Sequence, residues 1–168
     1  RIVLPVGISF FTFQALSYVV DVYRRRVAAA RSWIDFANYL AFFPQLVAGP
    51  IVRAADLVPQ MEAMPGRGTP IEAGRAVFLI LVCFFKNTVV ANLLSLRLVD
   101  PVFACSEIYS GPDILMSVYA YAVQIYCDFS AYSDIAIGTA LLMGFHFPDN
   151  FNAPYFGTSR QDFWRRWH

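Results

Sequence analysis

A histidine ends a short aromatic and basic run, and its chemistry is that of a general base. Residues 163–168 read Phe-Trp-Arg-Arg-Trp-His, so that His168 directly follows Trp167. A neutral imidazole, with an ordinary pKa of about 6.5, can take the proton of a hydroxyl group as its oxygen attacks a carbonyl carbon. We therefore take His168 as the catalytic candidate, with an orienting or structural role as the alternative.

The two arginines of the same run allow two interpretations. Arg165 and Arg166 could pair with phosphate groups of a donor substrate. They could equally hold a short helix at the cytoplasmic membrane surface, with the neighbouring tryptophans in the headgroup layer. Ser159 and Asp162 form the pattern of a helix N-terminal cap and predict that this short helix begins there.

Three ionisable residues, Lys86, Asp128 and Asp134, interrupt apolar stretches. Such residues are costly in lipid, which makes them candidates for a substrate path. Asp128 and Asp134 would not share one face of a regular helix, but a break at residues 129–133 would let both line a polar cavity. Alternatively they cap two half-helices or form buried hydrogen bonds. Lys86 is expected to face the interior of a helix bundle.

The composition of the chain indicates a membrane protein. Of 168 residues, 58% are hydrophobic and 15% charged, with a mean hydropathy of +0.50. One globular core of this size cannot bury that much apolar surface. The net charge of +1 gives no reason to expect a nucleic-acid partner. The cysteines have neither metal-ligand nor disulfide spacing and are expected to be ordinary small residues: Cys83, Cys105 and Cys127.

Long apolar stretches predict an all-α, polytopic transmembrane core with re-entrant or broken helices. Residues 2–20 and 76–99 are long enough to cross a bilayer, and basic residues after the first stretch place that end in the cytoplasm. Residues 114–147 are too long for one simple span and are expected to bend around residues 128–133. The acidic stretch 100–113 between them is predicted to be an outside loop.

The stretch 36–52 is interrupted by Pro44 and Gly49, which predicts a re-entrant or interfacial hairpin. Residues 57–70 are predicted to be a loop or a short surface helix. Amide and hydroxyl groups in these first segments are expected to form hydrogen bonds between helices: Ser9, Thr12, Gln14 and Gln45.

Four separated motifs closely resemble the membrane-bound O-acyltransferase family, in its bacterial alginate O-acetylation branch. Residues 124–138 read Gln-Ile-Tyr-Cys-Asp-Phe-Ser-Ala-Tyr-Ser-Asp-Ile-Ala-Ile-Gly, and residues 150–156 read Asn-Phe-Asn-Ala-Pro-Tyr-Phe before the run that ends at His168. The other two are Leu-Pro-Val-Gly-Ile-Ser-Phe-Phe-Thr-Phe at 4–13 and Phe-Pro-Gln-Leu-Val-Ala-Gly-Pro-Ile at 43–51. The likeness covers nearly the whole chain, in the same order.

This resemblance implies that residues 1–168 form a single membrane-embedded region of a larger multi-pass protein of the bacterial inner membrane. It implies transfer of an acyl group, expected to be acetyl, to hydroxyls of an exported polysaccharide such as alginate. The donor would be acetyl-CoA or another acyl thioester, with no bound cofactor and no metal. Periplasmic acyltransferase partner proteins are expected as well.

Family members also carry a second histidine further along, which is usually assigned the main catalytic role. The chain stops before such a segment, so this piece alone is expected to be an inactive fragment. Two other functions fit the broken apolar segments: a transporter or channel subunit, and a non-catalytic assembly subunit of a polysaccharide-modifying complex. Transporters commonly show internal repeats, and the sequence has none.

Overall fold

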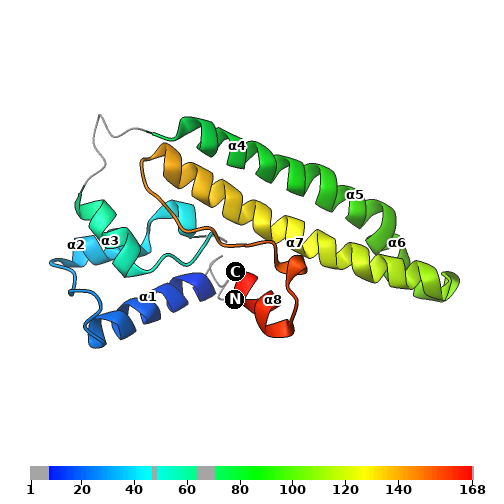
Figure 1. Cartoon of the computed structure of the whole chain (residues 1–168), viewed down its shortest axis with the longest axis horizontal. Helices are drawn as coiled ribbons and strands as arrows, with labels where there is room; N and C mark the ends of the chain where they lie inside the picture. Colours follow the sequence, from blue (N-terminus) through cyan, green and yellow to red (C-terminus); the bar gives the residue numbers. More distant parts are fainter. Residues whose placement is uncertain (1–7, 47–48, 64–70, 168) are drawn as a thin grey trace, which may run out of the picture.

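The computed structural model describes residues 8–46, 49–63 and 71–167, and these contain helices and no strand. Figure 1 shows a long helix pair and a group of shorter helices beside one of its ends. The short helices of the first group are α1 (Ile8–Tyr23), α2 (Trp33–Leu40), η1 (Phe43–Gln45) and α3 (Ala54–Glu62). The rest are α4 (Ala73–Phe84), η2 (Phe85–Ala91), α5 (Asn92–Leu94), η3 (Ser95–Val99), α6 (Asp100–Ala104), η4 (Ser106–Ile108), α7 (Gly111–Leu142), η5 (Pro154–Phe156) and α8 (Arg160–Arg166).

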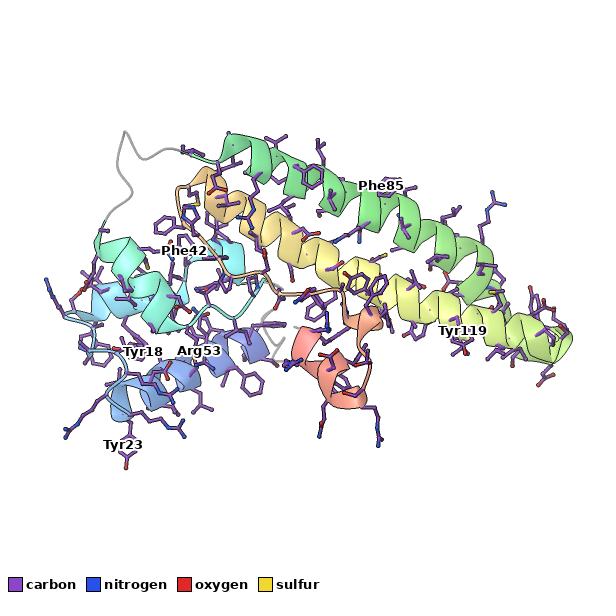
Figure 2. The ribbon with its side chains drawn as sticks, in the orientation of Figure 1. Tyr18, Tyr23, Phe42, Arg53, Phe85 and Tyr119 are labelled. Carbon is purple, nitrogen blue, oxygen red and sulfur yellow. The ribbon has the colours of Figure 1, made fainter. Side chains whose placement is uncertain are left out.

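The segments α4 to α6 join end to end into one helix, Ala73–Ala104, which contains the second predicted crossing. Within the described ranges it is the one helix long and apolar enough to cross a membrane. Large side chains on its outer side are exposed, such as Phe85 at 58%, and Tyr119 at 65% lies on the outer side of α7 (Figure 2). Two of its stretches, η2 and η3, are π-helical.

Helix α7 is straight and continuous, so the predicted break around residues 128–133 is wrong. It begins with a reciprocal capping box between Ser110 and Asp113. Ser130 and Ser133 donate their hydroxyl hydrogens back to carbonyls of their own helix, at 3.5 and 3.4 Å, and therefore need no break for their polar groups. The helix accommodates its acidic residues through partners on the neighbouring helix, described below.

Small residues let the two long helices pack closely. Gly138 of α7 lies against α4, and a Cβ built on it would lie 2.9 Å from the Ala76 carbonyl oxygen. Ala76 itself is fully buried, and Ala131 and Ala140 of α7 are buried likewise. Such small-residue contacts are typical of helices that associate in lipid, where close backbone approach replaces a hydrophobic driving force.

The first helical group packs around Tyr39, which is 1% exposed. Gln14 and Gln45 both donate amide hydrogens to the Tyr39 carbonyl oxygen, at 3.1 and 2.8 Å, and the Tyr39 hydroxyl donates to the Val52 carbonyl at 3.0 Å. The predicted bond of Gln14 to another segment is thus confirmed, and the bond of Gln45 joins η1 to α2 within the stretch 36–52. The predicted bond of Thr12 to another segment is wrong, because its hydroxyl bonds the Ile8 carbonyl of its own helix.

The stretch 36–52 is interrupted as predicted. Helix α2 ends at Leu40, and Pro44 lies within the short helix η1. A Cβ at Gly49 would lie 2.8 Å from the Pro44 carbonyl oxygen, so that only glycine fits at this close approach. The path of residues 36–52 relative to a membrane stays a prediction. Parts of the predicted first span (residues 2–20) and of the predicted polar stretch (residues 57–70) lie outside the described residues, and for those parts the predictions stay untested. The predicted outside loop contains helical turns, α6 and η4.

Residues just after α7 connect the long helix pair to the group of short helices α1 to α3. The His146 backbone N–H donates to Gln60 Oε1 at 2.7 Å, and Gln60 Nε2 donates to the His146 carbonyl at 2.9 Å. Phe42 packs between Phe145 and Phe147, with ring centroids 4.8 and 5.9 Å away. From here the chain turns back along α7, which brings the C-terminal tail to the middle of that helix (Figure 1).

Candidate functional site

Two polar contacts cross the interface of the long helices near their middles. Lys86 Nζ lies 2.7 Å from Asp134 Oδ2, with side chains 25% and 17% exposed. Asn87 Nδ2 donates to Asp128 Oδ1 at 2.9 Å. Lys86 thus faces the interior of the helix pair, as the sequence predicts. Both carboxylates accept hydrogen bonds in mid-helix and cap no helix end, so the capping interpretation is wrong. Their part in a substrate path stays a prediction.

The π-helical stretch η2 explains how two consecutive residues reach the same neighbouring helix. Lys86 and Asn87 are its second and third residues. A π-helix closes i→i+5 hydrogen bonds, so each turn holds more residues and consecutive side chains are separated by a smaller rotation than in an α-helix. The long lysine side chain spans the remaining distance. Asp128 and Asp134 can therefore both find partners although α7 itself is regular.

The tail that follows α7 is tied to the same region. Asn150 Nδ2 donates to the Ser133 hydroxyl oxygen at 2.7 Å, and the Tyr155 hydroxyl donates to the Ala122 carbonyl oxygen at 2.6 Å. Ser133 is buried and lies next to Asp134 in α7. These bonds hold residues 150–156 along the middle of α7.

An aromatic cluster fills the space between α7, the tail and α8. Its members are Tyr126, Phe129, Phe151, Tyr155, Phe163 and Trp167. Trp167 is central, with ring centroids 5.3 Å from Phe151, 5.5 Å from Phe163 and 6.1 Å from Tyr126. The Phe151 contact is edge-to-face at 88°, a favourable geometry for aromatic pairs.

Tyr126 connects this aromatic cluster to the ion pair. Its ring centroid lies 5.9 Å from Lys86 Nζ, within range of a cation–π contact. A continuous run of contacts therefore leads from Trp167 through Tyr126 and Lys86 to Asp134. His168 follows Trp167 in the chain and lies outside the described residues.

Helix α8 forms as predicted. The Ser159 hydroxyl accepts the Asp162 backbone N–H at 3.1 Å. Arg165 Nη2 and Arg166 Nε donate to the two Asp162 carboxylate oxygens at 2.7 and 2.9 Å. The Arg165 guanidinium, followed by that of Arg166, holds the pKa of Asp162 below its ordinary value. Arg165 remains 80% exposed, so part of its guanidinium is open to an anion.

Three contributors to this site were not among the predicted site residues: Asn87, Tyr126 and Asn150. Asn87 is a polar residue in mid-span next to Lys86, which is a signal that could have marked it. Tyr126 and Asn150 lie inside the motifs, but only the folded tail brings them together. Pairing of residues 41 or 48 apart in the chain leaves no trace in a single sequence.

The described residues bring together an ion pair, two side-chain amide groups and the aromatic cluster. Cys83 and Cys127 are buried and Cys105 is exposed, and all three are free cysteines. Within the described ranges no three His, Cys, Asp or Glu side chains are grouped to hold a metal ion. This arrangement can orient a neighbouring group and balance charge, but it holds no nucleophile–base pair of its own.

The sequence of the chain matches a known protein family and several known proteins. The family model described as MBOAT, membrane-bound O-acyltransferase family, matches residues 6–168. The chain is 44% identical over 168 residues to the probable alginate O-acetylase AlgI of Pseudomonas aeruginosa, covering 100% of this chain and 32% of that protein.

Two further relatives act on other polymers by name. A peptidoglycan O-acetyltransferase of Helicobacter pylori is 33% identical over 193 residues, covering 100% of this chain and 36% of that protein. A teichoic acid D-alanyltransferase of Streptococcus thermophilus is 28% identical over 167 residues, covering 97% and 40% respectively. The chain spans about a third of the length of the first relatives.

Proposed function

This chain belongs to the membrane-bound O-acyltransferase family, and from that premise we propose that its protein transfers an acyl group to hydroxyls of an exported polysaccharide. The acyl group is acetyl, the acceptor is a polymer such as alginate, and the donor is acetyl-CoA or another acyl thioester. The observation that carries this proposal is the match over all of this chain to AlgI at 44% identity.

The ranking of relatives favours acetyl over D-alanyl transfer. The two relatives named for O-acetylation are 44% and 33% identical, whereas the D-alanyltransferase is 28% identical. All three act on polymers by name, which supports a polymeric acceptor rather than a small alcohol.

The proposed reaction needs one base. An acceptor hydroxyl oxygen bonds to the thioester carbonyl carbon, its proton passes to the His168 imidazole, and the carbon–sulfur bond breaks. The leaving thiolate then takes that proton. The contacts that lead from Trp167 through Tyr126 to Lys86 support a positioning role for the residues that precede this histidine in the chain. Lys86, Asp128, Asp134, Arg165 and Arg166 are proposed to line the substrate path or support it.

The membrane arrangement is part of the proposal. The protein crosses the bacterial inner membrane several times, with the apolar helix Ala73–Ala104 as one crossing. Periplasmic acyltransferase partner proteins would complete delivery to the exported polymer, as the family resemblance implies.

The test uses the intact protein in a strain that lacks its own polysaccharide O-acetylation. Ester-linked acetate on the exported polymer is measured and normalised to the amount of protein in the membrane. We expect wild type to restore acetate, His168→Ala to lower it by about 100-fold or more, and Asp128→Asn to reduce it less.

His146→Ala is the matched control, because it removes the other histidine of this chain, whose ring is 56% exposed and lies 3.4 Å from Glu72 Oε1. It should leave acetate unchanged. Full activity of His168→Ala would make that histidine structural. If wild type adds no acyl group to any polymer tested, the transport interpretation replaces the proposed function.

A further inference from the structure

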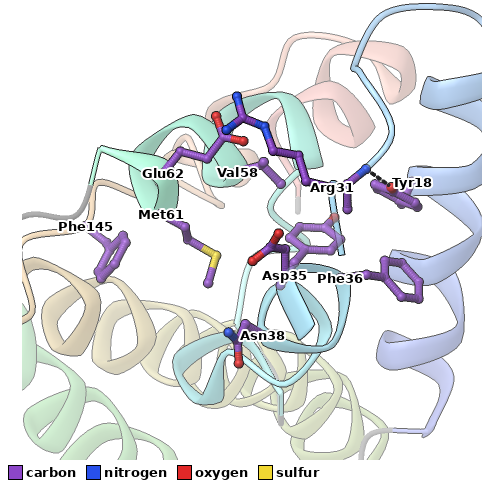
Figure 3. A pocket seen from close by; sticks show the side chains of 11 residues that line it. Tyr18, Arg31, Asp35, Phe36, Asn38, Val58, Met61, Glu62 and Phe145 are labelled. Atoms are coloured by element: carbon purple, nitrogen blue, oxygen red, sulfur yellow. Dashed lines mark hydrogen bonds between the residues drawn. The ribbon is translucent and has the colours of Figure 1, made fainter. Parts of the chain in front are cut away.

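A cavity of about 440 Å³ lies between α1, α2 and α3, away from the site described above. Figure 3 shows side chains from these elements and Phe145 around it. The volume falls within the roughly 300–1,000 Å³ range of ligand pockets. The residues that line it include Tyr18, Arg31, Asp35, Phe36, Met61 and Glu62.

Aromatic rings that pack against one another line one side of the cavity. Tyr18 lies 4.8 Å from Phe36 and 5.9 Å from Tyr39, measured between ring centroids. The Tyr18 hydroxyl accepts the Ala30 backbone N–H at 2.8 Å, which fixes this ring against the loop after α1. Met61 on the opposite side is a flexible side chain that adapts to what it contacts (Figure 3).

Charges of both signs border the same cavity. Arg31 comes from the loop before α2, Asp35 from α2 and Glu62 from α3, and all three are exposed. Within the part of the chain that the structure describes, none of the three side chains forms an ion pair. One guanidinium and two carboxylates that form no ion pair with any described residue therefore border an apolar hollow.

We propose that this cavity binds phosphatidylethanolamine. The Arg31 guanidinium receives the phosphate, Asp35 and Glu62 receive the ammonium group, and the start of one acyl chain lies against Tyr18, Phe36 and Met61. The argument is charge complementarity: an amphiphile with one anionic and one cationic group matches the unpaired charges, and its chain matches the wall. A purely anionic lipid would leave both carboxylates unpaired and repelled.

The position of the cavity fits a lipid, a step that rests on the proposed membrane arrangement. Tyr18 is near the end of α1, which is followed by three consecutive arginines, Arg24 to Arg26. Basic residues mark the cytoplasmic side of a span, and tyrosines gather at the level of the headgroups. A headgroup site at this end is therefore at the depth where phospholipid headgroups lie.

The experiment counts lipids bound to the intact protein. The protein is equilibrated in nanodiscs with equal parts phosphatidylethanolamine, phosphatidylcholine and phosphatidylglycerol, then released, and its retained lipids are counted by native mass spectrometry. Phosphatidylcholine carries a methylated ammonium that cannot donate hydrogen bonds, and phosphatidylglycerol has no ammonium group. We expect phosphatidylethanolamine to be retained about tenfold over either, as for one charge-assisted contact.

The variants separate the parts of the site. Arg31→Gln should lower the retention of all three lipids, because it removes the contact to the phosphate that they share. Met61→Trp should abolish the preference by filling the cavity, and Asp35→Asn should equalise phosphatidylethanolamine and phosphatidylglycerol. Arg24→Gln, an exposed arginine that does not line this cavity, and Leu81→Trp, on the outer side of α4, should retain it.

Equal retention of the three lipids by wild type, or an unchanged preference in Met61→Trp, overturns the proposal. If Met61→Trp does not fold, the result for Asp35→Asn decides, since this variant changes one exposed group by a single atom. An unchanged preference for phosphatidylethanolamine over phosphatidylglycerol in Asp35→Asn then overturns the proposal. Acyl transfer is not measured, so a failure of the proposed function leaves this test intact.

Discussion

Lys86 and Asp134 form an ion pair of which both members are mostly buried, so removing one partner should cost more than removing both. Lys86→Met leaves the Asp134 carboxylate unpaired between two helices. We expect it to lower the free energy of unfolding of the intact protein by about 3 kcal/mol, whereas Lys86→Met combined with Asp134→Leu should recover most of that loss. Titration with SDS in detergent micelles measures both.

Arg97→Met serves as the control, because it removes an exposed charge from the same continuous helix. Its effect should stay within about 0.5 kcal/mol. A double variant as unstable as Lys86→Met alone would mean that the pair contributes through packing rather than through charge.

The carboxylate of Asp162 makes helix α8 sensitive to acid. Arg165 and then Arg166 lower its pKa from an ordinary 3.8, so the folded state binds fewer protons than the unfolded chain. The stabilisation is complete above pH 3.8 and is lost as the pH falls through the lowered pKa. The rate of backbone hydrogen exchange in residues 160–167, corrected for intrinsic rates, should therefore rise roughly threefold relative to α7 as the pH falls through this range. Asp162→Asn should show no such transition.

At the residue scale the sequence predicts types of residue better than their pairings. Lys86, Asp128 and Asp134 stand out because each is charged within an apolar stretch. Their partners could not be predicted, because the rotation between Lys86 and Asn87 depends on a π-helical stretch that has no recognisable sequence pattern. Ser159 and Asp162 were predictable because a helix cap is a local contact.

At the scale of the elements, close contact between α4 and α7 depends on one glycine. Gly138→Ala adds a Cβ 2.9 Å from both the Ala76 carbonyl oxygen and Ile80 Cγ1, and should cost about 1–3 kcal/mol of unfolding free energy. Gly74→Ala adds the same atom on α4, where nothing lies within 4 Å. It should be neutral or stabilising by up to about 1 kcal/mol, since alanine favours helices.

The two alanine variants are matched in helix propensity and differ in what the added atom meets. Thermal unfolding of both in the same detergent gives the comparison. Equal stability of the two would show that the long helices can separate slightly at no cost, against the close packing inferred here.

The elements themselves were partly predictable. A long apolar stretch predicted the helix around residues 76–99, and Pro44 with Gly49 predicted the interruption before α3. The break in α7 was predicted wrongly because the apolar stretch is too long for one simple span and two acidic residues interrupt it. In fact Asp128 and Asp134 are satisfied by another helix, so the backbone of α7 has no reason to open. Periodicity describes one helix and carries no information on its neighbour.

At the scale of the whole molecule, the two ends of the helix pair differ in their number of basic residues. The N-terminal end of α4 lies toward α2 and α3, and the turn between α6 and α7 lies at the far end (Figure 1). The segments at the near end carry Arg24, Arg25, Arg26, Arg31, Arg53 and Arg75 together with acidic residues, whereas the far end carries Asp100, Glu107 and Asp113 and, as its basic residue, Arg97. The return of the tail to the middle of α7 was not predictable, because it depends on the aromatic cluster rather than on local signals.

This difference in basic residues predicts the orientation in the membrane. Basic residues stay on the cytoplasmic side, so reporter fusions to the intact protein after Val27 and after Ala104 should report inside and outside respectively. An alkaline phosphatase fusion, active only outside, should give about tenfold more activity at Ala104 than at Val27, and a cytoplasmically active reporter the opposite. Replacing Arg24, Arg25 and Arg26 by glutamine should weaken the difference, because these charges carry the signal. The reverse pattern in wild type would require the acidic turn at Glu107 to face the cytoplasm, and with it a different side of entry for the acyl donor.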